Sequence, residues 1–354
     1  MTLARQWILI DPLDTLFLKG SEPMVAGENH EVRSVFPPMP STMRGAIRTA
    51  IIQPRGISLM DFTASEPTVV QNYPLLGTWD NPGFEVVGPL FQVQIGGGDT
   101  EWLIPAPAHW FAAVPQSTED GQTVQVTVAE RLPDSTGTLG ICGSVRDPMW
   151  VLNPTDWDMR SLAGYWTNAV TMERVSTGSH SVNIHTSLEK ITANEPFVVG
   201  LGALFGNEVR VGIALDAGTR RARTGHLYSA THVRLRPGVA MAVGFSEELI
   251  PTHLDTEGIL QLGGEQRIVR YTLAKKPPLK GGTSAWVMSL SLVPFKALEK
   301  FGWDGFHRAS GPLTRMGGWD MKMGFHKPMT AYLPAGTVIM VGQDIPLPQG
   351  FVRI

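Results

Sequence analysis

Two hydroxyl residues and two arginines open a short helical pattern, and their types suit the binding of an anion. Ser41 and Thr42 directly follow the proline-rich segment SVFPPMP, and Arg44 and Arg48 stand four residues apart behind them. Prolines disfavour helix in the residues before them, so the pattern predicts a helix over residues 41–52 with a hydroxyl as its N-cap. Free amides at a helix N-terminus, with hydroxyls and arginines nearby, form a common phosphate site. The alternative is an ordinary capped helix whose arginines are only solvated.

The other face of this predicted helix is apolar. Met43, Ile47, Ala50 and Ile51 recur at helical spacing, so we expect them to pack into a core. The two arginines would then occupy a separate, cationic face that is available to a ligand.

A second basic block lies later in the chain. Residues 208–236 hold six arginines and two acidic residues. The run 209–215 alternates as a strand, a turn follows, and residues 226–235 return, which predicts a long β-hairpin. An arginine-rich tip suits a phosphate backbone, and a solvated, mobile tip is the alternative. The tip arginines are Arg220, Arg221 and Arg223.

A third candidate is the glycine-rich stretch SGPLTRMGGWDMKMGFHKP. Glycines without a Cβ let a phosphate or ribose approach the backbone, and neighbouring lysines supply positive charge. The stretch lacks the strand-to-helix context of a GxGxxG or GKS/T motif, so it predicts a basic loop and no nucleotide fingerprint. Its candidate binding residues are Gly317, Gly318, Lys322 and Gly324.

Residues suited to acid–base chemistry occur at two places. Glu28, His30 and Glu31 crowd one loop, but neighbours on a loop need not converge. Asp156 and Asp158 flank a tryptophan, and this spacing does not give the carboxylate pair about 5 to 9 Å apart that glycoside hydrolysis needs. The sequence therefore predicts no catalytic residue.

Metal ligands do not cluster either. His226 and His232 fall six residues apart on the predicted returning strand, with no cysteine or carboxylate set beside them. The single cysteine, Cys142, excludes an internal disulfide and is typical of a reducing compartment. We predict no metal and no cofactor.

Length and composition bound the class of protein. With 354 residues, 43% of them apolar, the chain is long enough for two domains. A net charge of −3 provides no global basic field, so nucleic acid would have to bind through local patches. No stretch approaches the roughly 18 apolar residues of a membrane span, and the first apolar run is too short for a signal peptide. We expect a cytoplasmic protein with no membrane partner.

The hydrophobic pattern predicts many short elements around a first strand at residues 6–10. The stretch 56–195 has a looser pattern and is predicted to be an insertion whose tryptophans fill an irregular core; stacking on bases or sugars is the alternative. KKPPLKGG at 275–282 predicts a domain boundary. Further predicted elements are strands 90–95 and 102–105, short helices at 155–162 and 187–191, strand 286–293, helix 294–301 and strand 331–341.

Four blocks in this order resemble a known family, the RAMP-superfamily subunit of type III-B (Cmr) CRISPR effector complexes that caps the 5′ tag of the guide RNA. They are DPLDTLFLKG at 11–20, SVFPPMPSTMRGAIRTAI at 34–51, VGIALDAGTRRARTGHLYSATHVRL at 211–235 and GGWDMKMGFHKPMTAYLPAGTV at 317–338. The long middle stretch matches nothing in the family. One departure concerns the loop after LF, where relatives are expected to show F-R-D-G-R and this chain has Leu18-Lys19-Gly20-Ser21.

The resemblance implies an α+β fold of two ferredoxin-like (RRM-like) domains with a large insertion in the first. The first domain would span residues 1–275, with the insertion at about 56–195, and the second would span residues 276–354. These boundaries combine the implied fold with the proline- and glycine-rich segment described above.

The resemblance also implies a non-catalytic subunit for antiviral defence against foreign RNA. Such a subunit binds the 5′ handle of the guide (CRISPR) RNA, meets target RNA through the complex, and bridges the large cyclase/polymerase-like Cmr subunit to the repeated Cmr backbone subunit. By position, the helix-start residues would line the handle pocket, and the later glycines, which match a G-x5-G pattern, would hold RNA backbone. The carried-over residues are Lys19, Ser41, Thr42, Arg44, Arg48, Gly317, Gly318 and Gly324.

Two other functions stay open from the sequence. Some RAMP proteins cut the guide precursor, so one alternative is a RAMP endoribonuclease that processes guide precursor RNA, with His30 as its acid–base candidate. The tryptophans and the Asp156-Trp157-Asp158 segment motivate a β-rich carbohydrate-active protein. Specific cleavage of repeat RNA would favour the first, and absence of bound nucleic acid would favour the second.

Overall fold

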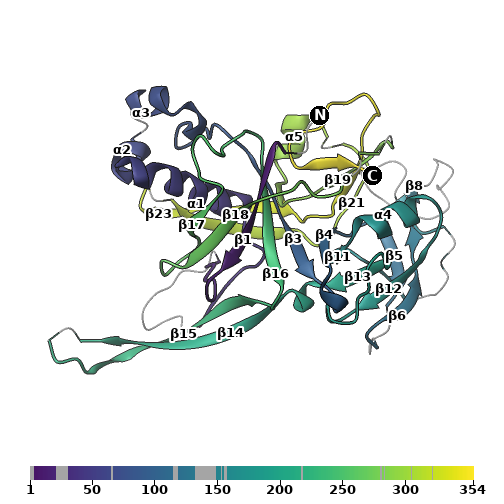
Figure 1. The fold of residues 1–354 in the computed structure, drawn as a ribbon, viewed down its shortest axis with the longest axis horizontal. Helices are drawn as coiled ribbons and strands as arrows, with labels where there is room; N and C mark the ends of the chain where they lie inside the picture. The colour runs from purple at the N-terminus through teal and green to yellow at the C-terminus, as the bar shows by residue number, and fades with distance from the viewer. Residues whose placement is uncertain are drawn as a thin grey trace.

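A computed structural model gives a mixed α/β fold with mostly strands and few helices, as the sequence predicts for an α+β protein (Figure 1). No helix in the described part of the chain is long and apolar enough to cross a membrane. The structure describes residues 4–20, 31–64, 67–114, 119–131, 149–152, 154, 158–216, 218–279, 281–282, 284–303, 305–320 and 322–354.

A ten-stranded sheet runs through most of the molecule in the order β17-β18-β1-β16-β3-β4-β11-β13-β12-β6. The predicted first strand is β1, whose residues Trp7, Ile8 and Ile10 are all buried because both faces of the sheet are covered there. The ten strands are β1 (Gln6–Pro12), β3 (Val86–Gln94), β4 (Thr100–Pro105), β6 (Gln122–Gln125), β11 (Tyr165–Thr167), β12 (Ser181–His185), β13 (Phe197–Gly200), β16 (Val239–Phe245), β17 (Glu257–Gln261) and β18 (Ile268–Ala274).

Four of these strands form an antiparallel group in the order β18-β1-β16-β3. Helix α1 (Pro40–Ile52) follows β1 in the chain, and its buried residues Met43, Ile47 and Ile51 share the main core with Ile8 and Ile10. The predicted apolar face of the helix is confirmed. The strand β3 lies inside the stretch that the sequence pattern marks as an insertion, yet it pairs with β16 in this central group.

Short helices and turns follow α1 at the same end of the sheet. Figure 1 shows α2 and α3 beyond the end of α1, on the side away from the insertion strands. The helical elements are α2 (Leu59–Thr63), α3 (Pro67–Asn72), α4 (Ala169–Ser176), α5 (Ala297–Phe301) and the 3-10 turns η1 (Gln53–Arg55), η2 (Pro74–Leu76), η3 (Gly96–Gly98) and η5 (Leu201–Ala203).

Residues 106–200, here called the insertion end, extend the sheet on its other side and close a second core. Trp110, Val124, Val182 and Val198 belong to this core. Helix α4 begins after Asn168, whose side chain accepts a hydrogen bond from the backbone N–H of Thr171 as an N-cap. The additional strands are β5 (Trp110–Ala113), β7 (Thr127–Val128), β8 (Glu130–Arg131), β9 (Met149–Trp150) and β10 (Met159–Ser161).

The two short helices predicted within the insertion are wrong where the structure describes them. Residues 159–161 form β10, which pairs with β5 in an antiparallel ladder. Residues 187–191 form turns and no helix. Local helical periodicity of such short stretches was overridden by strand pairing and by turn hydrogen bonds that the sequence pattern does not encode.

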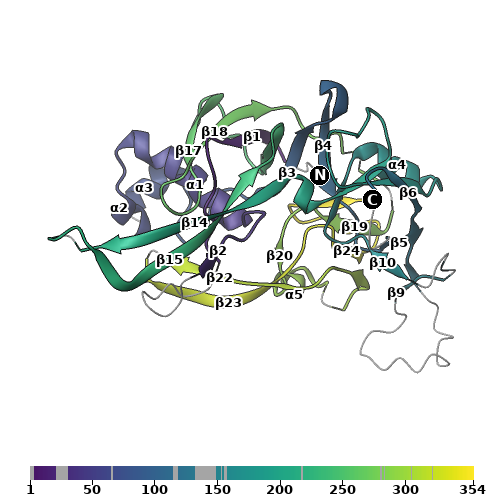
Figure 2. The same ribbon diagram turned by 90° about the horizontal axis from the view of Figure 1, so that it is seen from below.

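A long two-stranded hairpin projects from the molecule, which confirms the predicted hairpin and extends it. β14 (Phe205–Leu215) and β15 (Ala222–Leu235) pair over most of their length, and β2 (Glu31–Arg33) adds to the base of β15 in parallel. We call β14, β15 and the turn between them the arm. Figures 1 and 2 both show its tip far from the rest of the fold.

The part after residue 282 forms a smaller sheet in the order β21-β24-β19-β25, again antiparallel throughout. Helix α5 follows β19 in the chain, as predicted, although it is shorter. β22 and β23 form a hairpin, here called the C-terminal hairpin, which joins β20. The strands are β19 (Trp286–Ser289), β20 (Val293–Pro294), β21 (Arg308–Ala309), β22 (Thr314–Asp320), β23 (Phe325–Leu333), β24 (Val338–Met340) and β25 (Phe351–Arg353).

Candidate RNA-binding surface

The loop that carries Lys19 lies beside the segment that leads into α1. The N–H of Leu18 donates to Ser34 Oγ at 3.0 Å, and the N–H of Val35 donates to the Leu18 carbonyl at 2.8 Å. Lys19 forms an isolated β-bridge with Ser34, and its side chain is exposed. The fold therefore places an exposed lysine next to the proline-rich approach to the helix.

Helix α1 begins one residue earlier than predicted and has no hydroxyl cap. Met39 is the N-cap residue, which makes no side-chain capping hydrogen bond, and Pro40 is the first helical residue. A proline suits this position because its φ is already helical and it has no N–H to satisfy. The predicted N-cap role of Ser41 and Thr42 is therefore wrong; both lie in the first turn, Ser41 exposed and Thr42 half-buried.

The two arginines of α1 lie in different environments. Arg44 is half-buried and its Nη1 lies 2.9 Å from Glu85 Oε2. Arg48 is buried, donates from Nη2 to the Thr78 carbonyl, and has its guanidinium carbon 4.4 Å from the ring centre of Phe62. Burial, with the nearby charge of Arg44, lowers the pKa of Arg48 to about 10. The prediction of one open cationic face is wrong for Arg48.

The loop over residues 77–83 supplies the acceptor for Arg48. The N–H of Thr78 donates to the Asn81 carbonyl and the N–H of Asn81 donates to Thr78 Oγ1, both at 2.9 Å. Gly77 has a φ of 61°, and a Cβ there would collide with the backbone of Asn81, so the turn requires glycine. Sequence reasoning missed this contact because 30 residues separate Arg48 from Thr78.

The tip of the arm presents exposed arginines. Arg220 and Arg221 are both exposed and, within the described residues, neither makes an ion pair. Asp216, the acid at the tip, is held inside the turn, where its Oδ1 accepts from the N–H groups of Gly218 and Thr219 at 3.1 and 2.9 Å. The side chain of Arg223 lies outside the described residues.

The base of the arm is electrically neutralised. Arg210 and Arg234 each contact Asp14, at 3.0 and 2.9 Å, and each contacts Glu208, at 2.7 Å; Arg267 lies 3.1 Å from Asp14. The hydrogen bond from Arg210 holds the pKa of Asp14 below its usual value, and the one from Arg234 does the same for the pKa of Glu208. With Arg210 and Arg234 paired here, most of the remaining arginines of this block lie at the tip, and Arg236 is exposed at the base.

The predicted glycine-rich loop is mostly β-structure. Gly317 and Gly318 lie in β22, with a register shift just before Gly318, and Gly324 occupies the turn with a φ of 60°. Cross-strand pairing with β23 overrides the weak strand propensity of glycine. Lys322 is exposed at the turn, and its Nζ lies 4.0 Å from Asp80 Oδ2.

These contacts gather most of the predicted residues at one end of the molecule. Lys322 joins the tip of the C-terminal hairpin to the loop that holds Arg48, and Arg44 binds the end of the same loop. Figures 1 and 2 show the arm, α1 and the C-terminal hairpin all directed toward this end, which we call the arm end. The arm tip with Arg220 and Arg221 projects beyond the other elements.

The residues that suggested acid–base chemistry do not form a described constellation. Glu28 and His30 lie outside the described residues, and Glu31 in β2 pairs with Arg33 at 3.0 Å. Asp156 also lies outside them, and Asp158 contacts Arg160 at 3.3 Å.

Histidine and tryptophan side chains at the other candidate sites are mainly structural. His232 is buried, with Nδ1 3.2 Å from Thr15 Oγ1, and burial lowers its pKa. The side chain of His226 lies outside the described part of the chain. Among the described residues, no group of three histidine, cysteine or acidic residues could hold a metal ion. Trp110 and Trp166 are buried, which confirms the interpretation of the insertion tryptophans as core for these two.

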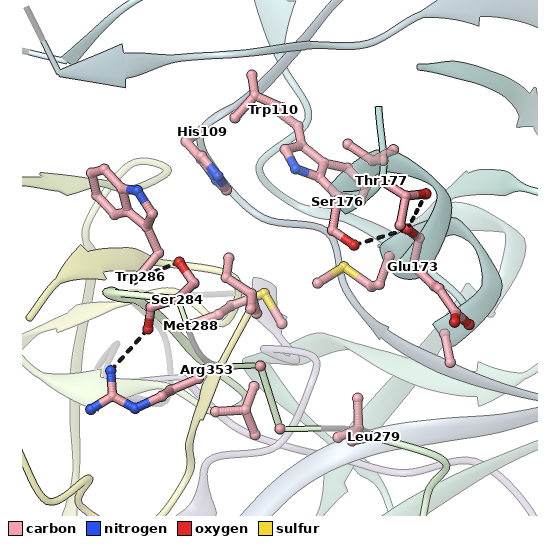
Figure 3. Close-up of a pocket in the computed structure, with 18 of the residues that line it drawn as sticks. His109, Trp110, Glu173, Ser176, Thr177, Leu279, Ser284, Trp286, Met288 and Arg353 are labelled. Carbon is pink, nitrogen blue, oxygen red and sulfur yellow. Dashed lines mark hydrogen bonds between the residues drawn. The ribbon is translucent and has the colours of Figure 1, made fainter. Parts of the chain in front are cut away.

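A cavity of about 550 Å³ lies between the insertion end and the C-terminal sheet (Figure 3). One wall comes from α4 and the start of β5, and the other from residues 278–279 and 281–282, β19 and β25. A second cavity of about 560 Å³ shares Leu279, Gly281 and Gly282 with the first in its lining. The sequence pattern gives no sign of either, because their walls come from segments that are far apart in the chain.

Comparison with known proteins identifies the family. The model of a CRISPR-associated protein family, Cas_Cmr3, matches residues 8–287, a span that includes β1, α1, the insertion and the arm. The chain belongs to the Cas_Cmr3 family. This confirms the resemblance to the RAMP-superfamily Cmr subunit that the four sequence blocks indicated.

Solved structures similar to this Cmr3-family chain are distant. A cryo-EM structure of the type III-B Cmr-beta complex bound to cognate target RNA and AMPPnP contains a chain with 16% identity and a TM-score of 0.49, covering 94% of this chain and 85% of that one. A crystal structure of a Csm3-Csm4 subcomplex of the type III-A interference complex contains one with 11% identity and a TM-score of 0.42, covering 95% and 92%. No curated protein matches.

Proposed function

We propose that this Cmr3-family chain is a non-catalytic, RNA-binding subunit of a type III-B CRISPR effector complex. It binds the 5′ handle of the guide RNA and bridges the large cyclase/polymerase-like subunit to the repeated backbone subunits. The observation that carries the proposal is the family match over residues 8–287, which includes the approach to α1 and the arm. The chemistry of the arm end supports it.

The strand orders support a RAMP architecture. The four central strands lie side by side in the order β18-β1-β16-β3. Numbered by their order in the chain, these are the fourth, first, third and second strands, and helix α1 follows the first. The C-terminal sheet repeats this arrangement. Its strands lie in the order β25-β19-β24-β21, which is again fourth, first, third and second in the chain, and α5 follows β19. Both orders are those of a β-α-β-β-α-β unit that lacks its second helix, so we infer two ferredoxin-like folds.

The RNA-binding residues divide into contact residues and positioning residues. The contact residues are exposed and can reach phosphate; they are Lys19, Ser41, Arg220 and Arg221. Arg48 is a positioning residue, because it is buried and holds the loop at 77–83 through the Thr78 carbonyl. The turn of the C-terminal hairpin adds the backbone of Gly324 and the charge of Lys322. Phosphate contacts position RNA without reading its sequence.

Salt dependence of guide-RNA binding tests the role of the arm tip. In the assembled complex, Arg220→Ala with Arg221→Ala should weaken binding and lower the slope of log affinity against log salt by about 1.4, since each single-strand phosphate contact contributes about 0.7. The matched control is Lys296→Ala with Lys300→Ala, which removes two exposed charges near α5, and should leave the slope unchanged. An unchanged slope in the arm variant would show that the tip does not contact RNA.

A further inference from the structure

The backbone attaches the arm to the rest of the fold along one strand. Within the described residues, every backbone hydrogen bond between the arm and another part of the chain involves β15, and none involves β14. β2 pairs with residues 229–231, and Leu16 and Val233 exchange N–H to carbonyl bonds of 2.8 and 2.9 Å. A projecting element with so few contacts moves easily, and a two-stranded arm held along one edge can rotate about that edge. The direction of the arm therefore depends on a second attachment, through β14.

Asp14, in the loop after β1, provides this second attachment. Its Oδ2 lies 3.0 Å from Arg210 Nη2 on β14, and its Oδ1 lies 2.9 Å from Arg234 Nη2 on β15. The same Oδ2 lies 3.1 Å from Nη1 of Arg267, which directly precedes β18. One carboxylate thus joins both strands of the arm to the main sheet. Phe205 also contacts the body, but it is the first residue of β14, and Arg210 lies farther toward the tip.

Further carboxylates hold the same three guanidinium groups in place. Glu208 accepts from Nε and Nη2 of Arg210 at 2.9 and 2.7 Å, and from Nε of Arg234 at 2.7 Å. Glu265 Oε2 lies 2.7 Å from Arg267 Nη2, and only 18% of the Arg267 side chain is exposed. Isolated ion pairs at a surface contribute little, but several charges that share partners in good geometry can fix a position.

We propose that Asp14 is a positioning residue that fixes the direction of the arm, because it ties Arg210 on β14 to Arg267 on the body. With β15 held by its backbone and β14 held at Arg210, rotation of the arm about β15 requires these ion pairs to break. The use of this attachment rests on the proposed function, since the direction of the arm decides where Arg220 and Arg221 meet RNA.

Distances between two spin labels in the purified chain measure the direction of the arm. The labels are attached at Ala222→Cys near the tip and Glu257→Cys on β17, both exposed positions, in a chain that also carries Cys142→Ser. Dilution with unlabelled chain ensures that each distance lies within one molecule. Asp14→Ala should widen the distribution of distances roughly twofold, because the arm then keeps mainly its attachment along β15.

Two further variants make the result specific. Arg210→Gln cuts the same link from the side of the arm and should widen the distribution as much as Asp14→Ala, with no further widening when the two changes are combined. Glu31→Ala removes an exposed ion pair within β2, beside the base of the arm, and should leave the distribution unchanged. The urea midpoint of global unfolding should shift little in each variant, because Asp14, Arg210 and Glu31 are all partly exposed.

An unchanged distribution in Asp14→Ala, or equal widening by Glu31→Ala, would overturn the inference. Should Asp14→Ala fail to fold, Arg210→Gln decides alone, because it breaks the same link. The measurement uses no RNA, so its failure would leave the proposed function standing. An assembled complex in which the arm tip does not contact guide RNA would, by contrast, count against the proposed function and not against this role of Asp14.

Discussion

At the scale of single residues, the structure separates two arginines that the sequence treats alike. Arg48 is enclosed by Phe62 and the Thr78 carbonyl, whereas Arg44 meets Glu85 at the surface. Their spacing of four residues places both on one face of α1. The Arg48 side chain, however, lies against the loop at 77–83, where it donates to the Thr78 carbonyl. A basic pair on a helix is thus divided into one structural residue and one ligand candidate.

We expect Arg48→Met to reduce the free energy of unfolding by about 2 kcal/mol, because it leaves the Thr78 carbonyl without its charged donor and removes the cation–π contact with Phe62. Arg44→Ala should change it by less than about 1 kcal/mol, because its partner Glu85 is exposed. Urea unfolding measures both. Equal losses for the two variants would contradict the division of roles.

At the scale of elements, His185 fastens three segments of the insertion end. Its Nδ1 lies 3.1 Å from Asp120 before β6, and its Nε2 lies 2.8 Å from Glu195 before β13. Both ring nitrogens face carboxylate oxygens, so the ring of this buried histidine joins β12 to the residues before β6 and before β13. Burial alone would raise the pKa of Asp120. Hydrogen bonds from Thr186, Ser187 and His185 outweigh this effect and lower the pKa to about 2.

This arrangement predicts acid sensitivity. The folded pKa of Asp120 lies below its ordinary value of 3.8, so its contribution to stability is present above about pH 4 and is lost as pH falls toward 2. Asp120→Asn should therefore cost about 2 kcal/mol at pH 7 and progressively less between pH 4 and pH 2. Denaturant unfolding across this range provides the measurement, with exposed Asp344→Asn as control. A constant difference across pH would rule the contribution out.

The elements also show how far sequence reasoning reaches. The apolar stripe of α1, strand β1 and the hairpin of the arm were predictable, because each follows from local periodicity or turn residues. Contacts such as Arg48 with Thr78, or His185 with Asp120, were not, because they join segments 30 and 65 residues apart. The C-terminal hairpin was mistaken for a loop because its glycines outweighed the alternation of the flanking residues. RNA-binding roles of the predicted site residues remain predictions.

At the scale of the whole molecule, the arm exposes an apolar stripe. Val209, Val211, Ile213 and Leu215 alternate along one face of β14, each at least half exposed, and β14 is an edge strand of the described sheet. Such a strand favours self-association.

The purified chain should therefore self-associate through the arm. Val211→Thr with Ile213→Thr keeps β-branched residues in the strand and should lower the associated fraction at equal protein concentration, with stability changed by less than about 0.5 kcal/mol. Sedimentation velocity measures the distribution, and Val170→Thr on α4 serves as a control away from the arm. An unchanged distribution would place the association elsewhere.

The ten-stranded sheet has a mechanical consequence. Paired strands lead from β17 at the arm end to β6 at the insertion end, and β4 joins the two halves: its residues 100–103 pair with β3, and its residues 104–105 pair with β11. Within the described residues, the ladder hydrogen bonds between the two halves of the sheet therefore run through this one strand. The relative placement of the insertion end and the arm end thus depends on how stiffly β4 holds the two ladders together.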